Sequence, residues 1–162
     1  MHTIFIDGSA GTTGLQIRQR LEQRTDIQLL TLPEEQRKDP QARQKALTEC
    51  DIAFLCLPDA AAREAVALAE GSQAVILDAS TAHRTAPGWA YGFPELGPAF
   101  ADKIKAGKRI AVPGCHASGF IALVQPLVQA GLLDTDALLT CHSVTGYSGG
   151  GKSMIAQYGA DG

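Results

Sequence analysis

The sequence has no long hydrophobic run and no basic cluster. Its apolar stretches fall far short of the roughly 20 residues that a membrane-spanning helix needs. No run of lysine and arginine exceeds two residues and the net charge is −3, so neither a nucleic-acid partner nor attraction to an anionic membrane is expected. The N-terminus also lacks the basic segment of a signal peptide. These absences predict a cytoplasmic protein with neither a nucleic-acid nor a membrane partner.

Cysteine is sparse and shows no disulfide pattern. The chain has four cysteines and no Cys-x-x-Cys pair, so they are expected to be free thiols in a reducing compartment. Cys50, Cys56 and Cys141 lie in or beside apolar stretches, which predicts small core residues. Cys115 instead follows a glycine at the end of an apolar run, which makes it the candidate for a reactive thiol.

The length and the order of apolar patterns indicate the fold class. The 162 residues are enough for one full domain but short for two. Short apolar runs alternate with helical patterns, and the runs expected to be strands are 3–7, 27–32, 51–57, 74–78 and 109–113. The expected helices are 12–24, 40–49, 59–70, 100–105 and 120–131. Buried strands joined by crossover helices predict an α/β fold with a Rossmann-like, doubly wound parallel sheet.

A glycine-rich turn directly follows the first predicted strand and opens the first helix. Small residues there let the backbone approach a pyrophosphate closely, and the helix N-terminus supplies free N–H groups. The spacing is Gly-x-x-Gly-x-x-Gly rather than the Gly-x-Gly-x-x-Gly fingerprint, but the strand–turn–helix context still predicts a dinucleotide site. The expected cofactor-binding residues of the turn are Gly8, Ser9, Ala10, Gly11, Thr12, Thr13 and Gly14.

The loop after the second predicted strand bears on which dinucleotide is bound. NAD sites usually place an acidic residue about 20 residues after the glycines, where it binds the ribose hydroxyls. Here Glu34 and Glu35 are followed by Arg37 and Lys38, which suit the 2′-phosphate of NADP. The basic pair favours NADP, with Arg37 and Lys38 as cofactor-binding residues. NAD and a merely solvated loop stay open as alternatives.

Cys115 lies at the N-terminal mouth of an apolar helix, just after the predicted strand 109–113. The helix dipole and free N–H groups stabilise a thiolate there, and the thiolate is the nucleophilic form. Ligands of parallel sheets bind at the carboxyl ends of the strands. Cys115 is therefore predicted to be a catalytic nucleophile, with a buried cysteine in a glycine turn as the alternative. The adjacent His116 points in another direction and is not favoured as its base.

Two later loops are candidates for substrate binding. The segment 78–84 leaves a strand end with hydroxyls and the Arg84 guanidinium, which suits a phosphate or carboxylate. The segment 146–153 is rich in glycine, serine and lysine but lacks the Walker spacing, so a P-loop ATPase is disfavoured. A zinc site is also disfavoured, because Cys115, His116, Cys141 and His142 match no familiar zinc spacing. No metal is expected.

These motifs resemble those of the N-acetyl-gamma-glutamyl-phosphate reductases of arginine biosynthesis, in their shorter variant, within the semialdehyde dehydrogenase superfamily. The matching segments run in the family's order along the whole chain: 8–14, 78–80 with Arg84, 91–95, 113–115 and 143–152. The resemblance implies that Cys115 attacks N-acetyl-L-glutamyl 5-phosphate and expels phosphate. NADPH would reduce the resulting thioester to N-acetyl-L-glutamate 5-semialdehyde. It also implies substrate contacts at Ser80, Arg84, Ser148, Gly149 and Lys152.

The resemblance also implies a domain organisation. Residues 1–114 would form the NADP-binding domain, and 115–162 would begin an incomplete α+β catalytic domain, because family members are roughly twice this length. A strand over 137–144 is expected to lack most of its sheet partners. We expect weak NADP binding, poor turnover by this chain alone, and a homo-oligomer when the protein is full length.

Two other functions stay open. Aspartate-semialdehyde dehydrogenases resemble this family in fold and thiol chemistry, but their nucleophile usually sits in an Asn-Cys sequence. Here the sequence is Gly114-Cys115-His116. A non-catalytic NADP-binding module is an alternative from a different class. Preferential labelling of the Cys115 thiol would separate it from an enzyme.

Overall fold

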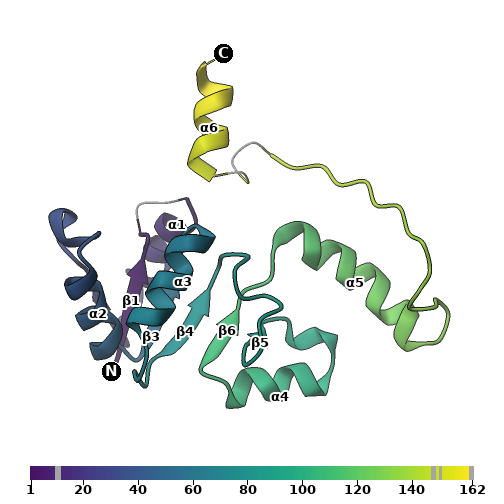
Figure 1. The fold of residues 1–162 in the computed structure, drawn as a ribbon, viewed down its shortest axis with the longest axis horizontal. Coiled ribbons are helices and arrows are strands. Elements are labelled where there is room, and N and C mark those ends of the chain that lie inside the picture. The colour runs from purple at the N-terminus through teal and green to yellow at the C-terminus, as the bar shows by residue number, and fades with distance from the viewer. Residues whose placement is uncertain (10–11, 147–148, 150, 161–162) are drawn as a thin grey trace.

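A six-stranded parallel sheet forms the centre of the computed structural model, which describes residues 1–9, 12–146, 149 and 151–160 (Figure 1). The strand order is β2-β1-β3-β4-β6-β5, and every neighbouring pair is parallel. The strands are β1 His2–Asp7, β2 Ile27–Leu30, β3 Ile52–Leu55, β4 Val75–Asp78, β5 Ala90–Tyr91 and β6 Arg109–Ala111. The predicted doubly wound α/β fold is confirmed, with the strand order reversing between β1 and β3.

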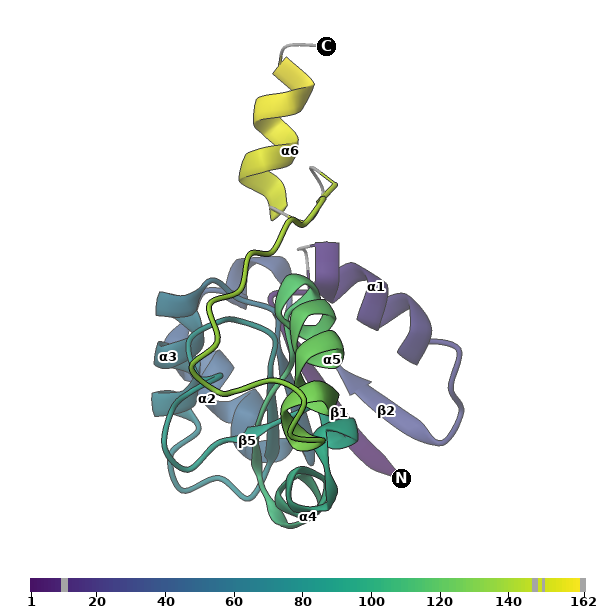
Figure 2. The same ribbon diagram turned by 90° about the vertical axis from the view of Figure 1, so that its right-hand side faces the viewer.

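Helices connect the strands and cover both faces of the sheet. The α-helices are α1 Thr12–Leu21, α2 Pro40–Glu49, α3 Asp59–Leu68, α4 Pro98–Ala106, α5 Cys115–Gln129 and α6 Gly151–Ala160. Two short 3-10 helices are η1 Glu34–Gln36 and η2 Pro94–Leu96. Figure 2 shows α2 and α3 on one side of the sheet and α1 on the other.

The core lies between the sheet and the α2–α3 layer. Leu47 of α2, Leu55 of β3 and Ile76 of β4 are fully buried there. Ala62 and Ala65 of α3 are also fully buried, and their small side chains let the helix approach the sheet closely. Alternate residues of β3 and β4 are buried on this side and half-buried on the other, so the strands are less evenly covered than their apolar runs predict.

Helix boundaries follow local capping chemistry. The predicted helix 40–49 matches α2 residue for residue, because Pro40 occupies the first turn and the Asp39 carboxylate accepts the N–H groups of Gln41 and Ala42. The helix predicted over 120–131 begins earlier, as α5, at Cys115. Gly114 is its N-cap, in extended backbone with ψ 153°.

The C-terminal part has no sheet beneath it. The strand predicted over 137–144 is wrong: this segment has no regular structure, and Leu138 and Val144 are fully exposed. A strand needs a neighbour for its backbone hydrogen bonds, and no described strand lies alongside. Figure 1 shows the segment as a coil that leads from the far end of α5 back toward α6. Cys141 is therefore exposed, and its predicted place in a core is also wrong.

Helix α5 buries none of its residues, and Phe120, Leu123 and Leu127 on its surface are exposed. Within the described residues, no helix combines the length and the apolar character needed to cross a membrane.

Candidate active site

The candidate site lies along the carboxyl edge of the sheet. The glycine turn follows β1, the segment 79–84 follows β4, and Cys115 follows β6. All strands are parallel, so these three segments leave the sheet at the same edge. Ligands of doubly wound folds bind at this edge.

Two positions of the turn after β1 accept only glycine. Gly8 has φ +84°, and a Cβ there would overlap the carbonyl group of Cys56 at the end of β3. A Cβ on Gly14 would overlap the backbone of Gly8 and Ser9, so α1 packs directly against the turn. The turn is thus built for close backbone approach. Of the other predicted members, Thr13 is exposed, while Ala10, Gly11 and the side chain of Thr12 lie outside the described residues.

A cleft of about 230 Å³ opens between the turn and the end of β2. Its apolar walls include Leu29, Leu30, Leu32 and Leu57, and its polar side brings Gly8 and Ser9 together with Arg18, Arg37 and Lys38. An apolar slot with a few convergent cations suits a base and a phosphate group. Glu34 and Glu35 are exposed and do not line this cleft. The structure therefore brings together the predicted glycine turn and basic pair.

Arg18 was not predicted from the sequence. It lies on α1 four residues after Gly14, so the two share a helix face, and this spacing is the signal that points to it. Its Nε–H donates to Glu22 Oε1 at 2.6 Å. Arg18 adds a third cation to the cleft.

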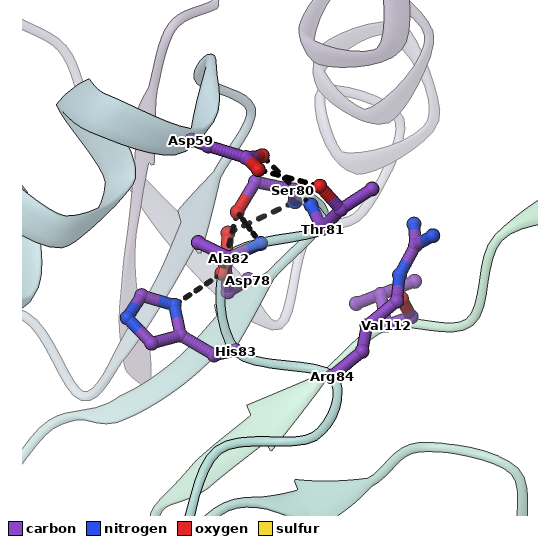
Figure 3. Close-up of polar contacts among 8 residues, drawn as sticks. All are labelled: Asp59, Asp78, Ser80, Thr81, Ala82, His83, Arg84 and Val112. Carbon is purple, nitrogen blue, oxygen red and sulfur yellow. Dashed lines mark hydrogen bonds and ion pairs between the residues drawn. The ribbon is translucent and has the colours of Figure 1, made fainter.

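A buried carboxylate organises the segment after β4 (Figure 3). Asp78 is fully buried. It accepts the Ser80 N–H at 2.9 Å and the Ser80 hydroxyl at 2.8 Å. His83 Nδ1 lies 2.6 Å from Asp78 Oδ2, and the His83 ring stacks on Trp89 with ring centres 4.2 Å apart. The sequence showed no partner for His83, because the pairing depends on how the segment folds back on its own strand.

An exposed carboxylate ties the same segment to α3. Asp59 accepts the Thr81 N–H at 3.0 Å and the Thr81 hydroxyl at 2.5 Å (Figure 3). The Thr81 hydroxyl is the main cause that holds the pKa of Asp59 below its usual value. The loops after β3 and β4 are therefore joined at the carboxyl edge.

Arg84 lies next to the nucleophile position. Its Nε–H donates to the Val112 carbonyl at 3.1 Å, and a Cβ on Gly114 would overlap its guanidinium. The guanidinium points away from the Asp78 cluster in Figure 3. Ser80 is buried, and its hydroxyl is used by Asp78 and the Ala82 N–H. Of the two predicted substrate residues in this segment, Arg84 is the one that lies against Gly114, the residue before Cys115.

Cys115 is the first residue of α5 and is exposed. No side chain caps this helix start, so its first N–H groups are free to meet an anion. Burial raises the pKa of the Cys50 thiol and of the Cys56 thiol to about 11, so neither is a thiolate at neutral pH. Cys115 and Cys141 are the exposed thiols.

The glycine-rich segment near the C-terminus is only partly described. His116 Nδ1 contacts the Ser143 hydroxyl, which brings the start of this segment to α5 beside Cys115. Gly149 is exposed, with its N–H donating to the Gly146 carbonyl at 2.9 Å. Ser148 and the side chain of Lys152 lie outside the described residues, so their predicted substrate contacts stay predictions.

Comparison with known proteins gives matches along the whole chain. Residues 3–106 match the family model described as semialdehyde dehydrogenase, NAD binding domain. Residues 115–160 match the one described as semialdehyde dehydrogenase, dimerisation domain.

Two curated relatives carry the same enzyme name. N-acetyl-gamma-glutamyl-phosphate reductase 2 of Pseudomonas putida is 56% identical over 160 residues, covering 98% of this chain and 51% of the relative. N-acetyl-gamma-glutamyl-phosphate reductase of Chelativorans sp. is 57% identical over 155 residues, covering 96% of this chain and 50% of the relative. The chain thus spans about half the length of the curated relatives it matches.

Solved structures show the same fold at low identity. Aspartate semialdehyde dehydrogenase from Francisella tularensis has a TM-score of 0.69 at 16% identity, over 97% of this chain and 48% of that one. The enzyme of that name with NADP from Candida albicans has a TM-score of 0.61 at 16% identity, over 82% of this chain and 48% of that one. This likeness is one of fold alone.

Proposed function

The chain belongs to the semialdehyde dehydrogenase family, and on that premise we propose that it supplies the NADP site and the nucleophile of an N-acetyl-gamma-glutamyl-phosphate reductase. One observation carries the proposal: Cys115 begins α5, and the Arg84 guanidinium lies against the preceding Gly114, on the same sheet edge as the glycine turn. The 56% and 57% identity to relatives of that name supports the substrate.

The residues of the cleft fit NADP. Gly8 and Gly14 leave room for a pyrophosphate against the backbone, and Arg37 and Lys38 would hold the 2′-phosphate. The two nearby glutamates face solvent rather than the cleft, which favours NADP over NAD. When bound, NADPH would supply the hydride that reduces the acyl group.

Arg84, Cys115 and the start of α5 have separate roles in the proposed reaction. Arg84 binds the phosphate of N-acetyl-L-glutamyl 5-phosphate, and the Cys115 thiolate attacks the acyl carbonyl carbon. The free N–H groups of α5 stabilise the oxyanion, and the C–O bond to phosphate breaks with its electron pair on the departing phosphate. A thioester remains on Cys115. After hydride addition to its carbonyl, the C–S bond breaks, which returns the thiolate and releases N-acetyl-L-glutamate 5-semialdehyde.

The wider organisation belongs to the same proposal. Residues 1–114 form the NADP-binding domain and residues 115–162 begin the catalytic domain. Ser80, Ser148, Gly149 and Lys152 contact the substrate. The full-length enzyme is a cytoplasmic homo-oligomer. The match of residues 115–160 to a dimerisation domain supports the oligomer.

Acylation of Cys115 tests the nucleophile. Incubating the chain with N-acetyl-L-glutamyl 5-phosphate is expected to add one N-acetylglutamyl group to the Cys115 peptide, measured by mass spectrometry after acid quenching. Hydroxylamine should remove the group, because it cleaves thioesters. The variant Cys115→Ser is expected to lose the adduct.

Cys141→Ser is the matched control, because Cys141 is the other exposed thiol. It should acylate like the unmodified chain. Iodoacetamide should label Cys115 in preference to Cys141 and spare Cys50 and Cys56 until the chain is unfolded. Equal acylation of Cys115 and Cys141 would contradict the proposal that Cys115 is the nucleophile. NADP binding without any acylation would favour the non-catalytic module.

Cofactor preference tests the basic pair. Replacing Arg37 and Lys38 together by glutamine is expected to weaken NADP binding about a hundredfold or more, because hydrogen bonds to charged groups contribute about 1.5–3 kcal/mol each. Binding of NAD should change little, since it has no 2′-phosphate. Fluorescence or calorimetric titration of the chain measures both.

Glu34→Gln with Glu35→Gln is the matched control and should leave the NADP-to-NAD ratio unchanged, because neither side chain lines the cleft. An unmodified chain that prefers NAD would contradict the assignment.

A further inference from the structure

A group of three charges, two of them buried, lies next to the glycine turn. Asp7 is the last residue of β1 and immediately precedes Gly8. Arg43 of α2 donates its Nε–H to Asp7 Oδ2 at 3.0 Å, and its second terminal nitrogen lies 3.0 Å from the same oxygen. Its remaining terminal nitrogen donates to Glu64 Oε1 of α3 at 2.6 Å. The Asp7 and Arg43 side chains are 6% and 7% exposed, whereas Glu64 is 55% exposed.

Asp7 belongs to the cleft as well as to the ion pair. Its residue lines the cleft beside Gly8 and Ser9. Its carbonyl accepts the Cys56 N–H at 2.8 Å, and its carboxylate is held by Arg43. The residue that opens the turn is therefore fixed through both its backbone and its side chain.

The charge of Asp7 is badly placed for an anionic ligand. Burial raises the pKa of Asp7, and the Arg43 guanidinium acts in the opposite direction and favours the carboxylate. A carboxylate shielded from water repels a nearby pyrophosphate more strongly than an exposed one does. Arg43, which does not line the cleft, balances this charge, and Glu64 is exposed enough for water to screen it.

A contribution to stability does not by itself explain the buried Asp7–Arg43 pair. The cost of removing two charges from water often equals or exceeds their attraction, so a buried pair is frequently replaced by apolar residues without loss. A role in ligand binding accounts for both the burial and the location beside the turn.

We propose that Arg43 is a positioning residue for dinucleotide binding: it neutralises Asp7 and fixes it, so that the Gly8 turn accepts a pyrophosphate. The inference rests on the proposed NADP site. It adds that the affinity for the pyrophosphate depends on a side chain from α2 that is separated from the ligand by Asp7.

The test compares two ligands on the chain. Arg43→Gln leaves Asp7 uncompensated and is expected to weaken NADP about tenfold, because an unpaired carboxylate next to the turn repels the pyrophosphate. Binding of 2′-AMP, which lacks the pyrophosphate, should weaken less than threefold. Arg43→Lys keeps the charge and should retain most of the NADP affinity. Titrations are run where thermal melts show every variant folded.

A second-site change separates charge from folding. Asp7→Asn combined with Arg43→Gln removes both charges and is expected to restore NADP affinity to within about threefold of the unmodified chain. Arg109→Gln is the matched control. Arg109 is a part-buried arginine at the start of β6 that donates to the carbonyls of Ala74 and Ala69. Its loss should lower the melting temperature without changing NADP affinity.

The outcomes are distinct. Equal weakening of NADP and 2′-AMP by Arg43→Gln, or no recovery in the double variant, overturns the inference and leaves the NADP site standing. If Arg43→Gln weakens NADP and 2′-AMP equally and the double variant also fails to regain NADP affinity, then Arg43 acts in folding alone. An unmodified chain that fails to bind NADP overturns the proposed function, and the inference with it.

Discussion

Replacing Gly8 with alanine is expected to destabilise the chain by roughly 2–5 kcal/mol and to abolish NADP binding, because two separate costs add. The backbone at Gly8 has φ +84°, which L side chains rarely adopt. The new Cβ would also overlap the Cys56 carbonyl group. The Cys56 carbonyl cannot move away easily, because the N–H of the same residue is hydrogen-bonded to the Asp7 carbonyl. Urea unfolding and NADP titration measure the two losses.

Gly71→Ala is the matched control for this experiment. Gly71 follows α3 with φ +79°, and nothing lies within 4 Å of a Cβ built on it. It should cost only the backbone term of about 1–2 kcal/mol and leave NADP binding intact. The difference between the two variants isolates the close approach of β1 to β3. Equal losses would show that the overlap at Gly8 is relieved without cost.

Replacing Asp78 with alanine is expected to destabilise the chain by about 3 kcal/mol, because buried donors lose a fully buried acceptor. Ser80 and His83 both bond to this carboxylate, and both are buried. The segment that carries Arg84 should loosen as well. Urea unfolding measures the stability, and acylation of Cys115 reports on Arg84.

Asp59→Ala provides the comparison, since Asp59 also accepts one backbone N–H and one hydroxyl. Its partner Thr81 is exposed, so water replaces the lost bonds and the unfolding midpoint should hardly move. The pKa of Asp59 is lowered in the folded chain, so its small contribution is present above its ordinary pKa and fades as the pH falls through the lowered value. Similar losses for both variants would contradict the importance of burial at Asp78.

Local signals predicted most of the fold. Helix 40–49 was predicted to the residue, because Pro40 and Asp39 mark its start chemically. The two-residue strand β5 gave no signal, since it lies in a loop rich in proline, glycine and aromatic residues and exists only because β6 offers it hydrogen bonds. The segment 137–144 shows the converse, an apolar pattern without a neighbour to pair with.

The candidate site was also predicted only where its signals are local in the sequence. The glycine turn and Cys115 are contiguous motifs, and the sequence was sufficient to single them out. The Asp7–Arg43 pair joins residues 36 positions apart and follows only from the packing of α2 against the sheet. The exposure of Cys141 likewise could not be predicted, because it depends on whether another segment packs over this residue, and the local sequence does not encode that.

The strand order also sets a length requirement on the ligand. The turn follows β1 and Cys115 follows β6, with β3 and β4 between them, so three strand spacings separate the two sites. At about 4.8 Å per spacing this amounts to roughly 14 Å along the sheet edge. A molecule anchored at the turn reaches the thiol only if it crosses two intervening strands. This separation favours an extended dinucleotide over a mononucleotide, whatever the side chains of the site recognise.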